Sequence, residues 1–249
     1  MDKLQTNISS IFDSNTYIVT ISKDRNPNII IESKIPNIKL CGNLAYDVKN
    51  SNIKVNMISK CYSSGTLFLS KLENLAQLLK IKYIHLEDKS NLVFDCNRKI
   101  KIDLSLLYIL STGKSWYNSK GYFSSNYENE FDNNSKIINK TMEELLHSVN
   151  YSAFSEDSKN KTVSEYFSEV KSSLVDEPNC KLIVWLEGLC KKMKKNRMIM
   201  YNVNLSKRFT LESEGGMKRK KYTTKFCKKN RKTVKTKIYT LEHLVPDNL

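Results

Sequence analysis

The segment NIKVNMISKCYSSGTLFLSKLENLAQLLKIKYIHLED, residues 52–88, decides how the rest of the chain is interpreted. Its first seven residues, 52–58, alternate apolar and polar side chains, which predicts a half-buried strand. After Ser63-Ser64-Gly65 the apolar residues recur at helical spacing from Leu67 to Leu79, and either serine hydroxyl can cap this helix. Residues 82–87 alternate again. The order of strand, glycine-containing turn, helix and strand predicts a βαβ unit.

The chain before this unit is predicted to contain strands alone. Residues 16–21, 28–32 and 35–40 are short apolar or alternating runs, and clusters of Asn, Asp, Pro and Gly separate them. Together with residues 52–58 they predict an antiparallel meander. The meander and the βαβ unit together predict that the first part of the protein is an α/β (α+β) domain with a central mixed sheet.

The chain after this unit is predicted to turn helical. Asp103 can cap a helix over 104–110 that stops at Gly113, and 115–122 should lead into another strand. Residues 124–139 are polar and rich in Asn and Ser, which predicts a loop or linker.

Two capping boxes, at Thr141 and Thr162, and a third helix over 180–195 predict a helical C-terminal region. We therefore expect a domain over 1–125, a linker over 126–140, a helical extension over 141–214 and a basic tail over 215–249.

The formal net charge of +15 is concentrated in one part of the chain. Residues 191–237 hold 18 Lys and Arg against two acidic residues, and the remainder is close to neutral. Gly215-Gly216 predicts a flexible joint before the densest part. We expect this part to bind nucleic acid or another polyanion through Lys218, Arg219, Lys220, Lys221, Lys228, Lys229, Arg231 and Lys232. Its aromatic residues could stack on bases; a solvated tail or a nuclear-localisation signal is the alternative.

Hydropathy and cysteine spacing argue against membrane-spanning, secreted and metal-binding proteins. The sequence holds no apolar run of about 20 residues, so we expect no membrane span, and it begins without the apolar core of a signal peptide. We therefore expect an intracellular protein whose six cysteines stay reduced. Because no Cys-x-x-Cys pair occurs and only three histidines are present, we expect no metal site and no disulfide framework.

A short aromatic motif suggests a family. Trp116, Tyr117, Gly121 and Tyr122 match an aromatic-Tyr-x-x-x-Gly-aromatic stretch. Together with the predicted order of elements, this motif resembles the GNAT N-acetyltransferase superfamily over roughly residues 15–125. The run over 102–122 looks in particular like the divergent GNAT-like proteins of giant DNA viruses. The chain is rich in amino acids whose codons are AT-rich, which agrees with such a source. The resemblance implies a viral protein in the host cytoplasm or nucleus, or one packaged in the virion.

The resemblance also implies an acetyl-CoA site and an amine acceptor. Its pyrophosphate would lie on the turn and helix start formed by Ser63, Ser64, Gly65, Thr66 and Leu67. Tyr117 would serve as the general acid toward the departing thiolate. Leu67 stands where the family carries a small residue, so its side chain either crowds the pyrophosphate or faces the core.

A general base is expected at the end of the central strand. His85, Glu87 and Asp88 lie there, although His85 could also pack in the sheet and the two acids could simply end the strand. Two functions stay open. One is an acyl-CoA-dependent N-acyltransferase whose basic tail contacts nucleic acid, and the other is a non-catalytic protein of the same fold that binds nucleic acid or forms part of a virion.

Overall fold

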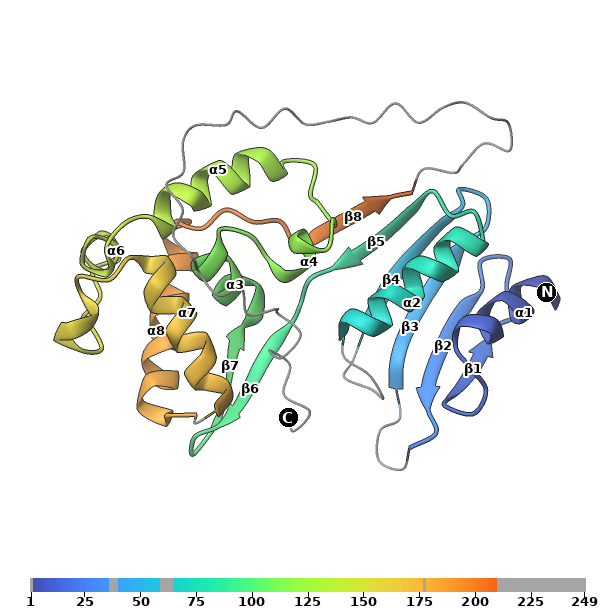
Figure 1. Cartoon of the computed structure of the whole chain (residues 1–249), viewed down its shortest axis with the longest axis horizontal. Helices are drawn as coiled ribbons and strands as arrows, with labels where there is room; N and C mark the ends of the chain where they lie inside the picture. The colour runs from blue at the N-terminus through green and yellow to red at the C-terminus, as the bar shows by residue number, and fades with distance from the viewer. Residues whose placement is uncertain (1, 36–39, 59–64, 177, 210–249) are drawn as a thin grey trace, which may run out of the picture.

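The computed structural model describes residues 2–35, 40–58, 65–176 and 178–209, and the chain is a mixed α/β protein (Figure 1). The strands are β1 (Tyr17–Ile21), β2 (Asn28–Ser33), β3 (Leu40–Asp47), β4 (Asn52–Ile58), β5 (Tyr83–Glu87), β6 (Asn91–Asp95), β7 (Lys99–Asp103) and β8 (Asn204–Arg208). The helices are α1 (Asp2–Ile11), α2 (Gly65–Leu78), α3 (Leu104–Thr112), α4 (Trp116–Ser119), α5 (Tyr127–Ile138), α6 (Met142–Val149), α7 (Val163–Asp176) and α8 (Cys180–Lys195), with a 3-10 turn over Glu156–Ser158.

Six strands form the main sheet in the order β1-β2-β3-β4-β5-β8. Every neighbouring pair is antiparallel except β4 and β5, which run parallel and are joined by α2. This is the predicted βαβ unit. Strand β8 comes from the far end of the described chain and closes the sheet beside β5.

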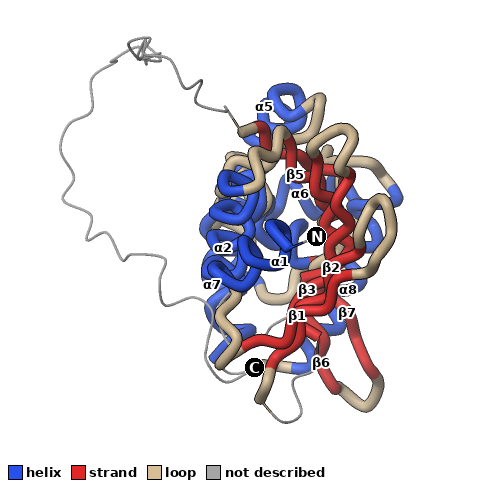
Figure 2. Tube along the Cα trace, turned by 90° about the vertical axis from the view of Figure 1, so that its right-hand side faces the viewer, coloured by secondary structure: helices blue, strands red, loops and turns tan. Residues whose placement is uncertain are grey.

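Helices α1 and α2 cover one face of this sheet, because every second residue of the strands is apolar on that side (Figure 2). Ile29, Leu44 and Ile84 are fully buried there. Gly42 permits the closest approach, since a Cβ at this position would lie 2.5 Å from Cζ of Phe68 on α2. A larger residue would push the helix away from β3.

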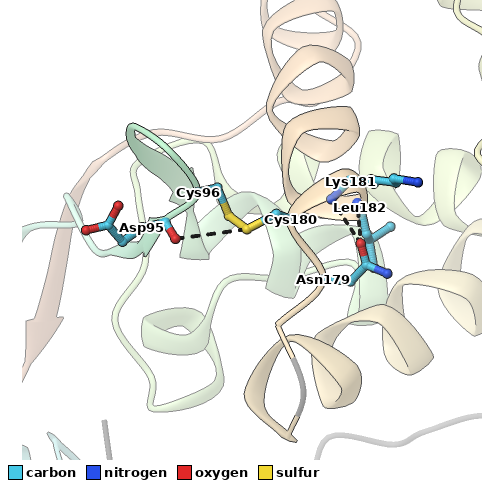
Figure 3. The surroundings of a disulfide bond; sticks show 6 residues. All are labelled: Asp95, Cys96, Asn179, Cys180, Lys181 and Leu182. Atoms are coloured by element: carbon cyan, nitrogen blue, oxygen red, sulfur yellow. Dashed lines mark hydrogen bonds between the residues drawn. A yellow bond between two sulfur atoms is a disulfide. The ribbon is translucent and has the colours of Figure 1, made fainter.

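A second hydrophobic cluster joins α3 and α5–α8 to the β6–β7 hairpin. Leu106, Phe167, Ile183 and Leu186 are fully buried in it. Helix α8 packs along β7, and a disulfide between Cys96 and Cys180 ties the hairpin to the first turn of α8 (Figure 3). Asn179 caps that turn by accepting from the backbone amides of Lys181 and Leu182.

Most of the sequence signals with a physical mechanism are confirmed. The strands predicted at 52–58 and 82–87 and the helix between them are present. The Asp103 carboxylate accepts from the Leu106 amide, and Gly113 ends α3 with a φ of 82°. Both capping boxes form, with Thr141 and Glu144 in one and Thr162 and Glu165 in the other. The helix over 180–195 is α8.

Several predicted elements are wrong. The strand-only N-terminal region contains α1, and the supposed loop over 124–139 contains α5, whose buried Ile137 contributes to the second cluster. Residues 116–119 form the short helix α4, because the Ser115 hydroxyl and the Asn118 side chain close a capping box, and the chain then leads to an isolated bridge of Phe123 with Ser206 and not to a strand. The β6–β7 hairpin and β8 were not predicted.

The expectation that the cysteines stay reduced and form no disulfide is also wrong for the described residues. Cys96 and Cys180 are bonded although 84 residues separate them, and Cys41 is disulfide-bonded as well. Cys190 is free and buried. Spacing rules detect close pairs such as Cys-x-x-Cys, but they cannot detect partners that only the packing of a hairpin on a helix brings together.

Three further expectations fall on residues outside the described ranges. Most of the strand predicted at 35–40 lies there, although Leu40 begins β3. Ser63 and Ser64 precede the first described residue of α2. The basic residues from Lys218 to Lys232 all follow Phe209, where the described part of the chain ends.

Candidate functional site

The parallel strands β4 and β5 separate toward their C-terminal ends. Their register runs from Asn52 opposite Tyr83 to Val55 opposite Leu86 and then stops, whereas β4 continues to Ile58. The last residues of β4 stay paired with β3, and β5 stays paired with β8 (Figure 1). One edge of β4 beyond Val55 therefore faces no partner strand among the described residues. Backbone amides and carbonyls on such an edge can bind an extended ligand.

Helix α4 lies across the opening between these strands. A Cβ built on Gly65, the first residue of α2, would lie 3.7 Å from the Trp116 ring. The neighbouring Tyr117 lies close enough to Asp88, which directly follows β5, to interact with it electrostatically. Two adjacent side chains of α4 thus lie near the start of α2 and the end of β5. The capping box of Ser115 and the bond from the Asn118 side chain to the Tyr122 carbonyl hold α4 in this position.

The Tyr117 phenol is a protonated group near neutral pH. Burial raises its pKa, and the negative charge of Asp88 raises it further, to about 12. Its ring lies 4.8 Å from that of Trp116 and 6.2 Å from that of Tyr122. A phenol in this state can donate a proton to a developing anion but cannot act as a base.

The three expected base candidates lie on two different faces of the sheet. Asp88 is 5% exposed and lies on the same side as Tyr117, where Ser90 donates to its carboxylate from both amide and hydroxyl. His85 and Glu87 are exposed on the opposite face, because side chains alternate along β5. The structure therefore brings Tyr117 together with Asp88 and separates it from His85 and Glu87.

The predicted cofactor turn is described in part. Gly65 opens α2, Thr66 and Leu67 follow in its first turn, and Leu67 is 49% exposed. Its side chain is thus excluded from the core, which removes one of the two alternatives for this residue. The start of α2 carries the positive end of the helix dipole.

Tyr122, the last aromatic residue of the motif, belongs to the core. It is fully buried, and burial and the nearby Glu73 carboxylate raise its pKa. Glu73 pairs with Lys207 of β8 at 2.8 Å, and the Lys207 ammonium lies 5.4 Å from the Tyr122 ring. This group of residues fastens β8 to α2 and leaves Tyr117 as the residue of the motif whose pKa is raised by Asp88.

The face of the sheet that α1 and α2 leave uncovered is hollowed beside β8. Three adjoining cavities of about 310, 350 and 450 Å³ all have Phe123 and Ser125 in their walls. Lys54, His85 and Glu87 line one cavity, and Tyr83 and Arg208 line another. We call this surface the Phe123 groove.

Two residues that line the Phe123 groove, His85 and Glu87, were predicted as base candidates, whereas Phe123 and Arg208 were missed because their signals are tertiary. Phe123 directly follows the aromatic motif, and its backbone pairs with Ser206 of a strand that was not predicted. Arg208 belongs to the same strand. Apolar and polar residues alternate over 82–88, which places Asp88 on the same face as the buried Ile84 and Leu86. This alternation could have distinguished Asp88 from His85 and Glu87.

Two further findings concern the described part of the chain, and a third concerns its relation to known proteins. It contains no cluster of three or more His, Cys, Asp or Glu side chains that could hold a metal ion. None of its helices has the length and apolarity that a membrane crossing requires. No family model, curated protein or solved structure matches the sequence or fold of the chain.

Proposed function

We propose that this protein is a GNAT-like acyltransferase that uses acetyl-CoA to acylate an amine. One observation carries the proposal: β4 and β5 separate after Val55 and Leu86, and α4 places Tyr117 at that opening beside Asp88. The basic segment after Phe209 would hold the enzyme on nucleic acid or another polyanion.

The residues at the opening fit the cofactor. The edge of β4 beyond Val55, which faces no partner strand among the described residues, offers backbone groups of the kind that pair with the two amides of a pantetheine arm. The space over Gly65 is bounded by Trp116 at ordinary contact distance, whereas the exposed Leu67 is left with the alternative in which its side chain crowds the pyrophosphate. The amides at the start of α2 would then meet the pyrophosphate.

Two side chains would handle protons in this reaction. Bound acetyl-CoA supplies an activated thioester. Tyr117, protonated at neutral pH, would donate to the sulfur of the leaving group. Asp88 is the best-placed group to accept the proton of the attacking amine, directly or through a water, and its bonds from Ser90 keep it oriented.

Calorimetric titration of the full chain with acetyl-CoA tests the proposal, with excess heparin present to occupy the basic segment. We expect saturable one-to-one binding that Gly65→Glu abolishes and Asn160→Glu, a matched charge on the exposed side of the helical region, leaves unchanged. Tyr117→Phe should keep the affinity and lower acyl transfer to an amine by about 10²- to 10⁴-fold. Absence of binding by the unaltered chain would leave the non-catalytic, nucleic-acid-binding function as the better one.

A further inference from the structure

The Phe123 groove lies on a sheet face whose polar side chains stay in solvent. Lys54, His85 and Glu87 are exposed on β4 and β5, and Asn204 and Arg208 are exposed on β8. Their neighbours in the sequence are buried against α2, so the strands are half covered and half open. A sheet face left open in this way is available to a partner.

Aromatic rings form part of this face. Phe123 is 40% exposed, and its ring centroid lies 4.5 Å from that of Tyr127. Tyr83 and His85 stack with an interplanar angle of 19° and a centroid distance of 5.8 Å. Rings that are exposed or partly exposed beside polar groups are suited to stacking with flat ligands.

The charge of the groove is positive. Neither Lys54 nor Arg208 has an ion-pair partner among the described residues, and the Arg208 guanidinium lies 6.0 Å from the Tyr83 ring. Two carboxylates lie in the groove walls: Glu87 is paired with Lys89 at 2.9 Å, and Glu128 lines the cavity formed by residues 123–129. An anionic partner at β4, β5 and β8 would therefore meet two unpaired cations and a neutralised acid, with Glu128 in the adjoining cavity.

The remaining wall groups are hydroxyls and side-chain amides. Ser125, Ser206, Asn202 and Asn204 line the cavity that also contains Lys54 and His85. Such groups donate and accept hydrogen bonds, so they suit base edges and sugar hydroxyls as well as phosphates.

The basic segment is covalently attached close to the groove. The described part ends at Phe209, directly after Arg208 of the groove, and Lys218 follows nine residues later. Nine residues span at most about 32 Å when fully extended. A polyanion bound by Lys218 and its neighbours is therefore within reach of the groove.

We infer that the Phe123 groove binds single-stranded nucleic acid. Its bases stack on Phe123 and on the Tyr83–His85 pair, and its phosphates lie near Lys54 and Arg208. Single strands are favoured over duplexes because only unpaired bases expose both ring faces. They are favoured over acidic peptides because carboxylates do not use the rings. The inference rests on the proposed polyanion contact and is independent of acyl transfer.

Fluorescence anisotropy of the full chain with a labelled 15-nucleotide oligothymidine tests the groove. We expect Phe123→Ala to weaken binding about ten-fold, the effect of losing one stacked base. Phe123→Tyr, which keeps a ring, should bind as the unaltered chain does. Phe154→Ala removes a similarly exposed ring (39% exposed) from the helical region and should change the affinity less than two-fold.

The salt dependence separates the cations of the groove from those elsewhere. Lys54→Ala and Arg208→Ala should each reduce the slope of log affinity against log salt by about 0.7. Lys192→Ala, an exposed lysine on α8, should leave the slope unchanged. A 15-base-pair duplex should bind equally well to the Phe123→Ala and unaltered chains, since it offers no base to the ring.

Photocrosslinking of full-length protein to an oligonucleotide that carries 5-iodouracil locates the bound strand. Crosslinks to Phe123, Tyr83 or Tyr127 are expected. Crosslinks confined to residues 210–249, or equal losses for Phe123→Ala and Phe154→Ala, would overturn the inference. Competition with polyglutamate is a further test. If polyglutamate displaces the strand from the groove and binds the Phe123→Ala and unaltered chains equally, the inference is overturned and the groove is assigned to an acidic protein. Each result is obtained without acetyl-CoA, so failure of the acyltransferase proposal is distinguishable.

Discussion

The sheet region (the six-stranded sheet with α1 and α2) and the helical region (α3, α5–α8 and the β6–β7 hairpin) differ in how their polar groups and faces are used. The helical region pairs more of its polar groups within the chain, and the sheet region leaves more of them exposed. In the helical region, two reciprocal capping boxes sit side by side, because Thr141 and Thr162 also form a backbone bridge. A disulfide joins its hairpin to its longest helix. The sheet region instead has one uncovered face and an edge of β4 that lacks a described partner beyond Val55.

This difference separates stability from function in the molecule. Groups that are bonded within the chain contribute to stability and have nothing left to offer a ligand. The open groups of the sheet region contribute little to stability, and they are the ones that can bind. Substitutions should therefore destabilise the helical region more than the open face of the sheet.

The largest effect is expected from the disulfide. Replacing both Cys96 and Cys180 by Ser opens a cross-link over 84 residues, which should lower the free energy of unfolding by about 4 to 5 kcal/mol on the chain-entropy model. Urea unfolding measures the change, and the double variant is preferable to a reductant because Cys41 is also bonded. A loss below about 1 kcal/mol would show that the bond is absent in solution and would weaken the contrast between the regions.

The next effect is expected at Asp103, where β7, α3 and the end of α8 meet. Its carboxylate accepts from the Leu106 amide, from Lys194 at 2.8 Å and from the Tyr201 hydroxyl at 2.7 Å. Asp103→Ala removes a cap and two partners and should cost about 3 kcal/mol in urea unfolding. Asp103→Asn, which keeps an acceptor oxygen for the cap, should cost clearly less; equal losses would contradict the role of these bonds.

The capping boxes should give a smaller change. Thr141→Ala and Thr162→Ala should each lower the free energy of unfolding by about 1 kcal/mol, because each removes an acceptor for a first-turn amide. Asn56→Ala on the open face of β4 is the matched control from the sheet region and should change it by less than about 0.5 kcal/mol. A larger loss for Asn56 than for the threonines would reverse the comparison.

The smallest effect depends on pH. Hydrogen bonds from Arg98 and Lys191 lower the pKa of Glu187 to about 2 from its ordinary value of 4.5. A lowered folded-state pKa contributes stability above pH 4.5, and this contribution is lost as the pH falls toward 2. Glu187→Gln should therefore destabilise by less than about 1 kcal/mol at pH 7 and have no effect near pH 2. A constant difference between the variants across this range would contradict the prediction.

The sequence predicted elements whose cause is local and missed those whose cause is tertiary. The Asp103 cap, both threonine capping boxes and the strand-helix-strand unit follow from side chains within a few residues of one another. Helix α5 was missed because its polar composition hides a single buried row that includes Asn134 and Ile137. Asn134 is fixed by bonds to the backbone of Met200, which is distant in the sequence.

The candidate site likewise has residues that local sequence signals predicted and residues that only the tertiary structure reveals. Tyr117 and Gly65 came from a motif and a turn, whereas the partnership of Tyr117 with Asp88 needed the packing of α4 on the end of β5. The Phe123 groove depends on β8, a short strand with no distinctive pattern, so no local signal could have predicted it. The placement of His85 and Glu87 away from Tyr117 follows from alternation alone.

The position of β8 has a consequence for how the protein is made. Because Glu87 of β5 pairs with Asn204, the last strand of the sheet leaves the ribosome well after the strand it pairs with. At ordinary synthesis rates the interval is on the order of ten seconds, which is long compared with hairpin formation. The nascent sheet therefore waits with β5 as a temporary edge while the helical region is completed. This interval is when chaperones would be most needed and when pairing of β5 with another chain would compete with native folding.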